Sequence, residues 1–272
     1  MGFTSPHNDN SRTPGRSKPR ECLSLPPHDR NEVANNPSHS TEIEAKFYIP
    51  ADVTKKVIKG IPFTMIEQHY FPRETVDGLL RDFQVAEQVP DVADFSSARI
   101  RRARAPSGEV SYAIEFKGKK AAFEGSRIFR REFGISISKG MYSQLLSSAT
   151  AGTLRKRRHD VAGEIKHEGI TYRTTAQVDV ILAAGKNLRD VKVHFSTVDI
   201  ELPRVEFAAS LRAGKHSWQF LHKCLDISCG DSEAARELST RRIAKHGFDA
   251  TRLKALKTLE GYVQRAKRES GR

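Results

Sequence analysis

The chain has 272 residues, of which 38% are hydrophobic and 29% are charged, and its formal net charge is +13 at pH 7. No apolar run approaches the ~20 residues that a membrane-spanning helix needs, and the N-terminus has no apolar segment typical of a secretory signal. The three cysteines, Cys22, Cys224 and Cys229, are scattered, which predicts a reducing, cytoplasmic location rather than a disulfide framework. The positive charge predicts an anionic partner, either a compact polyphosphate or nucleic acid.

Residues 1–40 are rich in Pro, Ser, Asn, Arg and His and poor in apolar residues. Such a composition cannot form a hydrophobic core, so we expect a disordered leader over this range. The folded domain is then expected over residues 41–247.

The six residues EIEAKF, from Glu42 to Phe47, alternate strictly between polar and apolar side chains. In an extended strand Glu42, Glu44 and Lys46 share one face, and the opposite face is apolar. Two carboxylates in a row suit a hard cation, and an ammonium suits a phosphate. The same pattern also fits an ordinary amphipathic strand with a solvated face.

Six further segments repeat this alternation with charged residues of mixed sign on one face. Their polar faces carry Arg99 and Arg101; Glu115 and Lys117; Arg130 and Glu132; Lys156 and Arg158; Gln177 and Asp179; and Asp199 and Glu201. A sandwich would turn its apolar faces inward, whereas a closed barrel with a charged interior and helices outside gives this pattern directly. The sequence therefore predicts an α+β fold built on a closed β-barrel.

Helices are expected where the apolar spacing changes to three and four residues. The stretch from Gly214 to Gly247 is interpreted as helical, and Leu253, Leu256, Leu259 and Val263 mark an amphipathic helix within residues 248–272. We expect this last helix, whose other face is basic, to pack on the barrel or to cap one of its mouths.

In their order along the chain, these segments resemble the CYTH domain, or triphosphate tunnel metalloenzyme, family. The resemblance rests on Glu42-x-Glu44-x-Lys46, on the paired arginines of Arg99-Ile100-Arg101, and on the lysine, arginine-glutamate, lysine-arginine, aspartate and paired-acid strands that follow. It covers roughly residues 41 to 247. It implies an eight-stranded antiparallel closed β-barrel, a tunnel that binds a triphosphate together with a divalent metal ion.

The resemblance also implies a role for each residue of the charged faces. The phosphate-binding set is Lys46, Arg99, Arg101, Lys117, Arg130, Lys156 and Arg158. The set that would hold Mg²⁺ or Mn²⁺ is Glu42, Glu44, Asp199 and Glu201. The residues that would orient the attacking water, or pair with neighbouring cations, are Glu115, Glu132 and Asp179. Two positions depart from the family pattern: Gly134 replaces a second acid, and Asp199 replaces a glutamate.

The expected activity is metal-dependent hydrolysis of a triphosphate, with inorganic triphosphate as the preferred substrate. Adenylate cyclase is the alternative within the family, and a non-catalytic module that binds polyphosphate or RNA is the alternative outside it. Nucleic acid would have to use the opposite face of the strands, where Arg102, Arg104, Arg155 and Arg157 lie by the period of two. The simpler interpretation of these four arginines is solvated surface charge.

Overall fold

The computed structural model describes residues 38–89, 95–119, 121–123, 126–228 and 233–270 of the chain. The strands are β1 Ser38–Tyr48, β2 Phe63–Tyr70, β3 Phe95–Arg104, β4 Val110–Gly118, β5 Ala121–Phe123, β6 Ser126–Ser136, β7 Gly152–His167, β8 Ile170–Gly185, β9 Arg189–Asp190, β10 Ser196–Glu201 and β11 Leu225–Asp226. The α-helices are α1 Ala51–Val57, α2 Val76–Asp82, α3 Val85–Gln88, α4 Lys139–Leu146, α5 Glu206–Arg212, α6 Glu233–Glu237, α7 Thr240–His246 and α8 Ala250–Ser270, with 3₁₀ turns η2 Arg73–Thr75 and η4 Gln219–Lys223.

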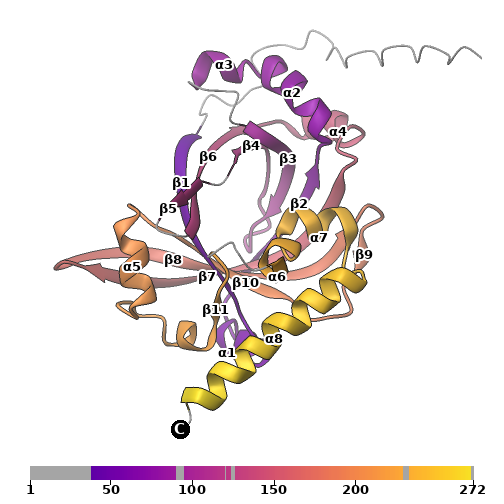
Figure 1. Ribbon diagram of the computed structural model, residues 1–272. Coiled ribbons are helices and arrows are strands. Elements are labelled where there is room, and N and C mark those ends of the chain that lie inside the picture. The colour runs from indigo at the N-terminus through magenta and orange to yellow at the C-terminus, as the bar shows by residue number, and fades with distance from the viewer. Residues whose placement is uncertain (1–37, 90–94, 120, 124–125, 229–232, 271–272) are drawn as a thin grey trace, which may run out of the picture.

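All strand pairings are antiparallel and belong to one sheet, in the order β11-β1-β10-β8-β7-β2-β3-β4-β6-β5, with β9 on β8. Strand β1 has a further partner, because its first half pairs with β6 while its second half pairs with β10. The α+β class and the large antiparallel sheet are thus confirmed. Figure 1 shows β1, β6, β4, β3 and β2 arching round a common space.

The hydrophobic core lies outside this arch, between the strands and the helices. On one side Ile100, Ile114 and Phe116 pack under α2, α3 and α4. On another, Phe47 and Val198 pack under α1, α5 and η4. These residues alternate with the charged ones along each strand, so burying the apolar face turns the charged face inward.

A third apolar cluster covers one end of the arch. Tyr48 and Leu154 share faces with Lys46 and Lys156 by the period of two, and they pack against residues of α6, α7 and α8. The predicted C-terminal helix is α8, and its Leu256, Leu259 and Val263 are buried in this cluster.

The structure differs from the sequence prediction at the start of the first strand and between Gly214 and Gly247. Strand β1 begins at Ser38, three residues inside the predicted leader, because Ser38–Ser40 pair with β6. The rest of the predicted leader, residues 1–37, lies outside the described residues. The continuous helical prediction from Gly214 to Gly247 is wrong, since the chain there forms η4, β11, α6 and α7. No helix in the described part of the chain is both long and apolar enough to cross a membrane.

Gly152 lets α7 approach the start of β7. Its φ is +152°, and a Cβ built on it would lie 2.2 Å from the backbone oxygen of Ala244. We expect Gly152→Ala to lower the free energy of unfolding by about 2–4 kcal/mol, because backbone has to move to relieve the clash. Urea unfolding measures this. The control is Gly78→Ala in α2, where a Cβ meets nothing within 4 Å and where alanine should raise stability by up to about 1 kcal/mol. Equal stability of the Gly152 variant and the wild type would contradict this packing.

Candidate anion-binding cavity

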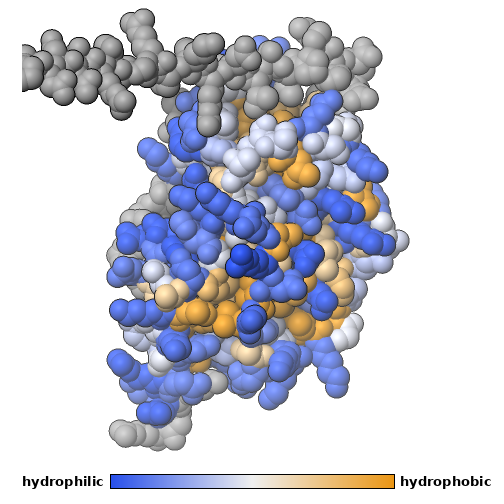
Figure 2. Space-filling model, turned by 90° about the vertical axis from the view of Figure 1, so that its right-hand side faces the viewer, coloured by the Kyte–Doolittle hydropathy of each residue, from blue (hydrophilic) through white to orange (hydrophobic). Residues whose placement is uncertain are grey.

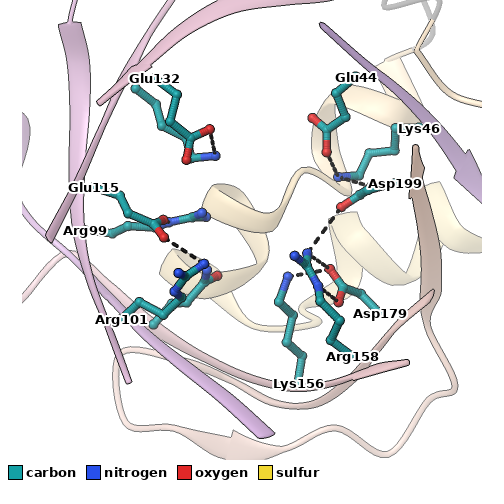
Figure 3. A network of polar contacts seen from close by, with 12 residues as sticks. Glu44, Lys46, Arg99, Arg101, Glu115, Glu132, Lys156, Arg158, Asp179 and Asp199 are labelled. Atoms are coloured by element: carbon teal, nitrogen blue, oxygen red, sulfur yellow. Dashed lines mark hydrogen bonds and ion pairs between the residues drawn. The ribbon is translucent and has the colours of Figure 1, made fainter. Parts of the chain in front are cut away.

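The arch encloses a cavity of about 450 Å³ whose wall is mainly charged. Seven lysine and arginine side chains and five carboxylates border it, an excess of two positive charges over those acids. These residues are Lys46, Arg99, Arg101, Lys117, Arg130, Lys156, Arg158, Glu44, Glu115, Glu132, Asp199 and Glu201. Figure 3 shows labelled members of this set projecting from opposite sides toward the same space, with C-terminal helices behind them.

On one side of the cavity, Glu115 of β4 holds two arginines of β3. Arg99 Nε lies 2.5 Å and Arg101 Nη1 lies 2.8 Å from its two carboxylate oxygens. Strand register explains the contact, because Arg99 lies directly opposite Glu115. Burial alone would raise the pKa of Glu115, but Arg99, Arg101 and Lys117 outweigh it and hold that pKa well below its usual range.

The neighbouring pair repeats this arrangement between β4 and β6. Lys117 donates to Glu132 at 2.5 Å, and the two residues are opposite each other in the register. Arg130 of β6 reaches Glu44 of β1 at 3.3 Å, which links this side of the cavity to the next.

On the opposite side, Asp179 of β8 anchors two cations of β7. It accepts hydrogen bonds from Arg158 at 2.8 Å and from Lys156, and its side chain is completely buried. Burial would raise the pKa of Asp179, but Arg158 and Lys156 lower it well below its ordinary value. Burial and the nearby Arg158 lower the pKa of Lys156 to about 8, although Asp179 acts in the other direction.

A third set of ion pairs joins β1 and β10. Lys46 lies opposite Asp199 in the register and Glu44 lies opposite Glu201. Lys46 Nζ is 2.7 Å from Asp199 Oδ1 and 3.7 Å from Glu44 Oε1, so one ammonium stands between two carboxylates. Burial would lower the pKa of Lys46, but Asp199 and Glu44 raise it.

Asp199 lies among charges of both signs, with Lys46 and Arg158 close to its carboxylate. Burial and the charges of Glu44 and Asp179 raise its pKa, against the opposing effect of Lys46. Its Oδ1 is buried and, among the described residues, receives no well-directed hydrogen bond despite its closeness to Lys46. Crowded carboxylate oxygens of this kind fit a hard divalent cation. No three His, Cys, Asp or Glu residues in the described ranges are grouped closely enough to hold a metal ion by themselves.

The cavity brings together most of the residues that the sequence singled out. All seven predicted phosphate ligands border it, as do Glu44, Asp199 and Glu201. Of the three predicted water-orienting acids, Glu115 and Glu132 border it, whereas Asp179 has no exposed surface and lies behind Lys156 and Arg158. The backbone of Glu42 pairs with Arg130, but its side chain lies outside what the structure describes.

Several residues of the site carried no role in the sequence analysis. Gln68 and Tyr70 are buried on β2, and the Tyr70 hydroxyl lies 3.4 Å from both Gln68 Oε1 and Arg99 Nη1. Thr240, the first residue of α7, borders the cavity together with Ser136. Gln68 and Tyr70 share one face of β2 by the period of two, which is a signal that the sequence carries. Nothing in the local sequence of Thr240 signals its contact, which depends on how α7 docks.

No family model matches the sequence, and no curated protein is similar to it. Solved structures that resemble it include the PH1819 protein from Pyrococcus horikoshii OT3 (17% identity, TM-score 0.37, 64% of this chain and 86% of that one). Others are HpAC1 from Hippeastrum, described with a dominant triphosphatase activity (14%, TM-score 0.43, 71% and 93%), and the inorganic triphosphatase NE1496 (12%, TM-score 0.34, 75% and 97%). All three TM-scores are below 0.5, so these likenesses do not establish the function of this chain.

Asp179 allows a test of how the cavity is held together. Asp179→Asn should lower the free energy of unfolding by about 3–5 kcal/mol, because Lys156 and Arg158 lose their buried counter-ion. Tripolyphosphate should then raise the Tm of the variant more than that of the wild type, since it replaces the missing negative charge. Asp160→Asn, at an exposed position on the same strand as Lys156 and Arg158, is the control and should change stability by less than about 0.5 kcal/mol.

The same variant should change the response to acid. The folded-state pKa of Asp179 is depressed, so its stabilising contribution is present above its ordinary pKa of 3.8 and is lost as the pH falls toward the folded-state pKa. The difference in stability between wild type and Asp179→Asn should therefore shrink below that pH. A difference that grows in acid would contradict the assignment.

Proposed function

We propose that this protein is a divalent-metal-dependent triphosphatase of the CYTH, or triphosphate tunnel metalloenzyme, family, with inorganic triphosphate as substrate. The eight strands β1, β10, β8, β7, β2, β3, β4 and β6 would then form a closed tunnel. The pairing of β1 with both β10 and β6 supports this closure.

One observation carries the proposal: a cavity of ligand size is lined from several strands by cations in excess of carboxylates. A cavity meant for an apolar ligand would have apolar walls, and ion pairs needed only for stability would not have to face a common space. A compact polyanion is the ligand that such a wall matches, because each guanidinium can bind phosphate oxygens through two parallel hydrogen bonds.

The lining also favours inorganic triphosphate over a nucleotide. None of the described residues that border the cavity is aromatic, so a nucleobase would find no ring to stack on. The apolar cluster around Tyr48 and Leu154 covers one end of the space, so a nucleoside attached to the phosphate chain would have to extend through the other end.

Glu44, Asp199 and Glu201, with Glu42 beside them in sequence, are the residues that we propose to hold Mg²⁺ or Mn²⁺ together with phosphate oxygens. Their all-oxygen donors and the crowding around Asp199 fit such an ion. When bound, the metal would neutralise phosphate charge and lower the pKa of a coordinated water.

The other acids act through the cations. Glu115 and Asp179 hold Arg99, Arg101, Lys156 and Arg158 in place, so they are positioning residues. Glu132 has 19% of its side chain exposed, more than Glu115 or Asp179. It is therefore the acid that we assign to orienting the attacking water.

Phosphate release from tripolyphosphate tests the proposal. We expect turnover with Mg²⁺ or Mn²⁺ and none after chelation, and Glu44→Gln should lower kcat/KM by at least about a hundredfold, since a ligand to the ion loses its charge. Glu109→Gln, in the exposed turn between β3 and β4, is the matched control and should leave the rate unchanged. When ATP is the substrate, formation of ADP and phosphate indicates a hydrolase, whereas formation of cyclic AMP and pyrophosphate indicates a cyclase. Lack of turnover of inorganic, thiamine and nucleoside triphosphates with every divalent metal tried would overturn the enzyme assignment.

Arg101 and Arg104 separate phosphate binding from surface charge on a single strand. Arg101 borders the cavity, whereas Arg104 is exposed on the other face of β3. Arg101→Ala should weaken tripolyphosphate binding about ten- to a hundredfold, because a charge-assisted contact is lost. The variant should still fold, since Glu115 keeps Arg99 as its partner. Arg104→Ala should change the Kd by less than about threefold. Calorimetric titration measures both, and a silent Arg101→Ala beside a damaging Arg104→Ala would place the binding site on the outer face.

A further inference from the structure

The outer surface of strands β3, β2 and β7 carries a group of arginines that the cavity does not use. We call Arg102, Arg104, Arg155 and Arg157, together with Phe63, the outer arginine face. Arg102, Arg104 and Arg157 are exposed, and Arg155 keeps 38% of its side chain exposed. Figure 2 shows the side of the molecule on which β2 and β3 lie, where hydrophilic side chains stand over apolar ones.

The strand register fixes the spacing of these arginines. Met65 of β2 is opposite both Arg104 and Arg157, and Glu67 is opposite both Arg102 and Arg155. Each row therefore spans two strand spacings, which places its arginine Cα atoms about 10 Å apart, and the two rows are about 7 Å apart along the strands. The outer arginine face is thus a two-by-two grid of guanidinium groups on a sheet surface.

Two carboxylates offset part of this grid: Asp190 pairs with Arg155, and Glu67 lies between Arg102 and Arg155 and attracts both. Within the described ranges no carboxylate forms an ion pair with Arg102, Arg104 or Arg157. Asp190 pairs with Arg155 at 3.2 Å, and Glu67 is engaged by His69 at 2.8 Å. This contrasts with the cavity on the other side of the same strands, where each arginine of β3 and β7 has a carboxylate partner.

Aromatic rings accompany the arginines. Phe63 is 37% exposed, and the guanidinium of Arg157 lies 4.8 Å from its ring centre. Tyr112 of β4 is half-buried opposite Arg102 in the register. Cations that follow a phosphate backbone, next to rings on which bases stack, are what proteins use to bind single-stranded nucleic acid.

We propose that the outer arginine face binds single-stranded nucleic acid, with the arginines on consecutive phosphates and Phe63 under a base. Unpaired arginines and an exposed ring favour this partner over an acidic protein, which would need only the charges. They also favour it over an anionic membrane, because the face lies on a sheet and offers no apolar ridge for insertion beyond Phe63. The net charge of +13 is of the right sign for such a partner. This inference is independent of the triphosphatase proposal, since it uses the opposite side of the strands.

Fluorescence anisotropy with a labelled RNA of about 20 nucleotides and a 5′-hydroxyl end tests the proposal, because such a ligand has no triphosphate for the cavity. We expect Arg102→Ser, Arg104→Ser and Arg157→Ser in combination to weaken binding at least about tenfold. The slope of log K against log salt should become about two units shallower, since each phosphate neutralised on a single strand contributes about 0.7. Phe63→Ala alone should weaken binding about tenfold at unchanged salt slope, because stacking is lost without loss of charge.

The matched control replaces three exposed cations of α8, Lys254, Lys257 and Arg265, with serine and so removes the same charge. The proposal is supported if this control binds RNA as tightly as the wild type does and if saturating tripolyphosphate does not weaken that binding. Equal losses in both triple variants would show a general effect of net charge and would overturn the proposal. Displacement of the RNA by tripolyphosphate would place it in the cavity and would also overturn it. Binding to vesicles of phosphatidylcholine and phosphatidylserine in equal parts, without binding to RNA, would assign the face to membranes instead.

Discussion

The ion pairs between inward-facing cations and carboxylates of neighbouring strands are the interactions on which this structure depends. A buried guanidinium or ammonium is costly unless an opposite charge and hydrogen bonds replace its hydration. Here the antiparallel register supplies the partner: Arg99 faces Glu115, Lys117 faces Glu132, and Arg158 faces Asp179 across adjacent strands. The charged wall is therefore stable before any ligand arrives, and the guanidinium groups are already oriented toward the cavity.

This charged interior forces the hydrophobic core to the outside of the strands. The apolar faces are buried only because helices cover them, α2 to α4 on one side and α1 with α5 on another. The C-terminal helices do the same at one end, and their own charges are paired: Arg252 is buried between Glu237 of α6 and Asp249, at 2.6 and 2.5 Å. The position of α7, and with it the place of Thr240 at the cavity, thus depends on contacts more than 80 residues away in sequence, including the close approach to Gly152.

The period of two explains how much of the site the sequence could predict. Alternation alone assigned Arg99 and Arg101 to the inner face and Arg102 and Arg104 to the outer face, as the structure places them. Alternation says nothing of depth, so it could not distinguish Glu132 at the wall from Asp179 behind it. It also failed where pairing rather than pattern decides the structure. Ser38–Ser40 have the composition of the leader, yet they extend β1 because β6 offers an open partner.

Lys46 is the residue at which the two proposed ligands meet. It stands between Asp199 and Glu44, so in the free protein it fills the place that a cation would take between these acids. With Glu44 and Asp199 holding a divalent ion, Lys46 would lose its two carboxylate partners, and its ammonium would turn toward the phosphate chain. Metal and triphosphate would then each increase the affinity for the other, by the same factor, because the coupling between two binding sites is reciprocal. Arg99, Lys156 and Arg158 are tied instead to Glu115 and Asp179, two acids to which we assign no metal and which therefore keep these partners. The rigid part of the wall would therefore fix the position of the substrate, and the exchange of partners by Lys46 would make its binding depend on the metal.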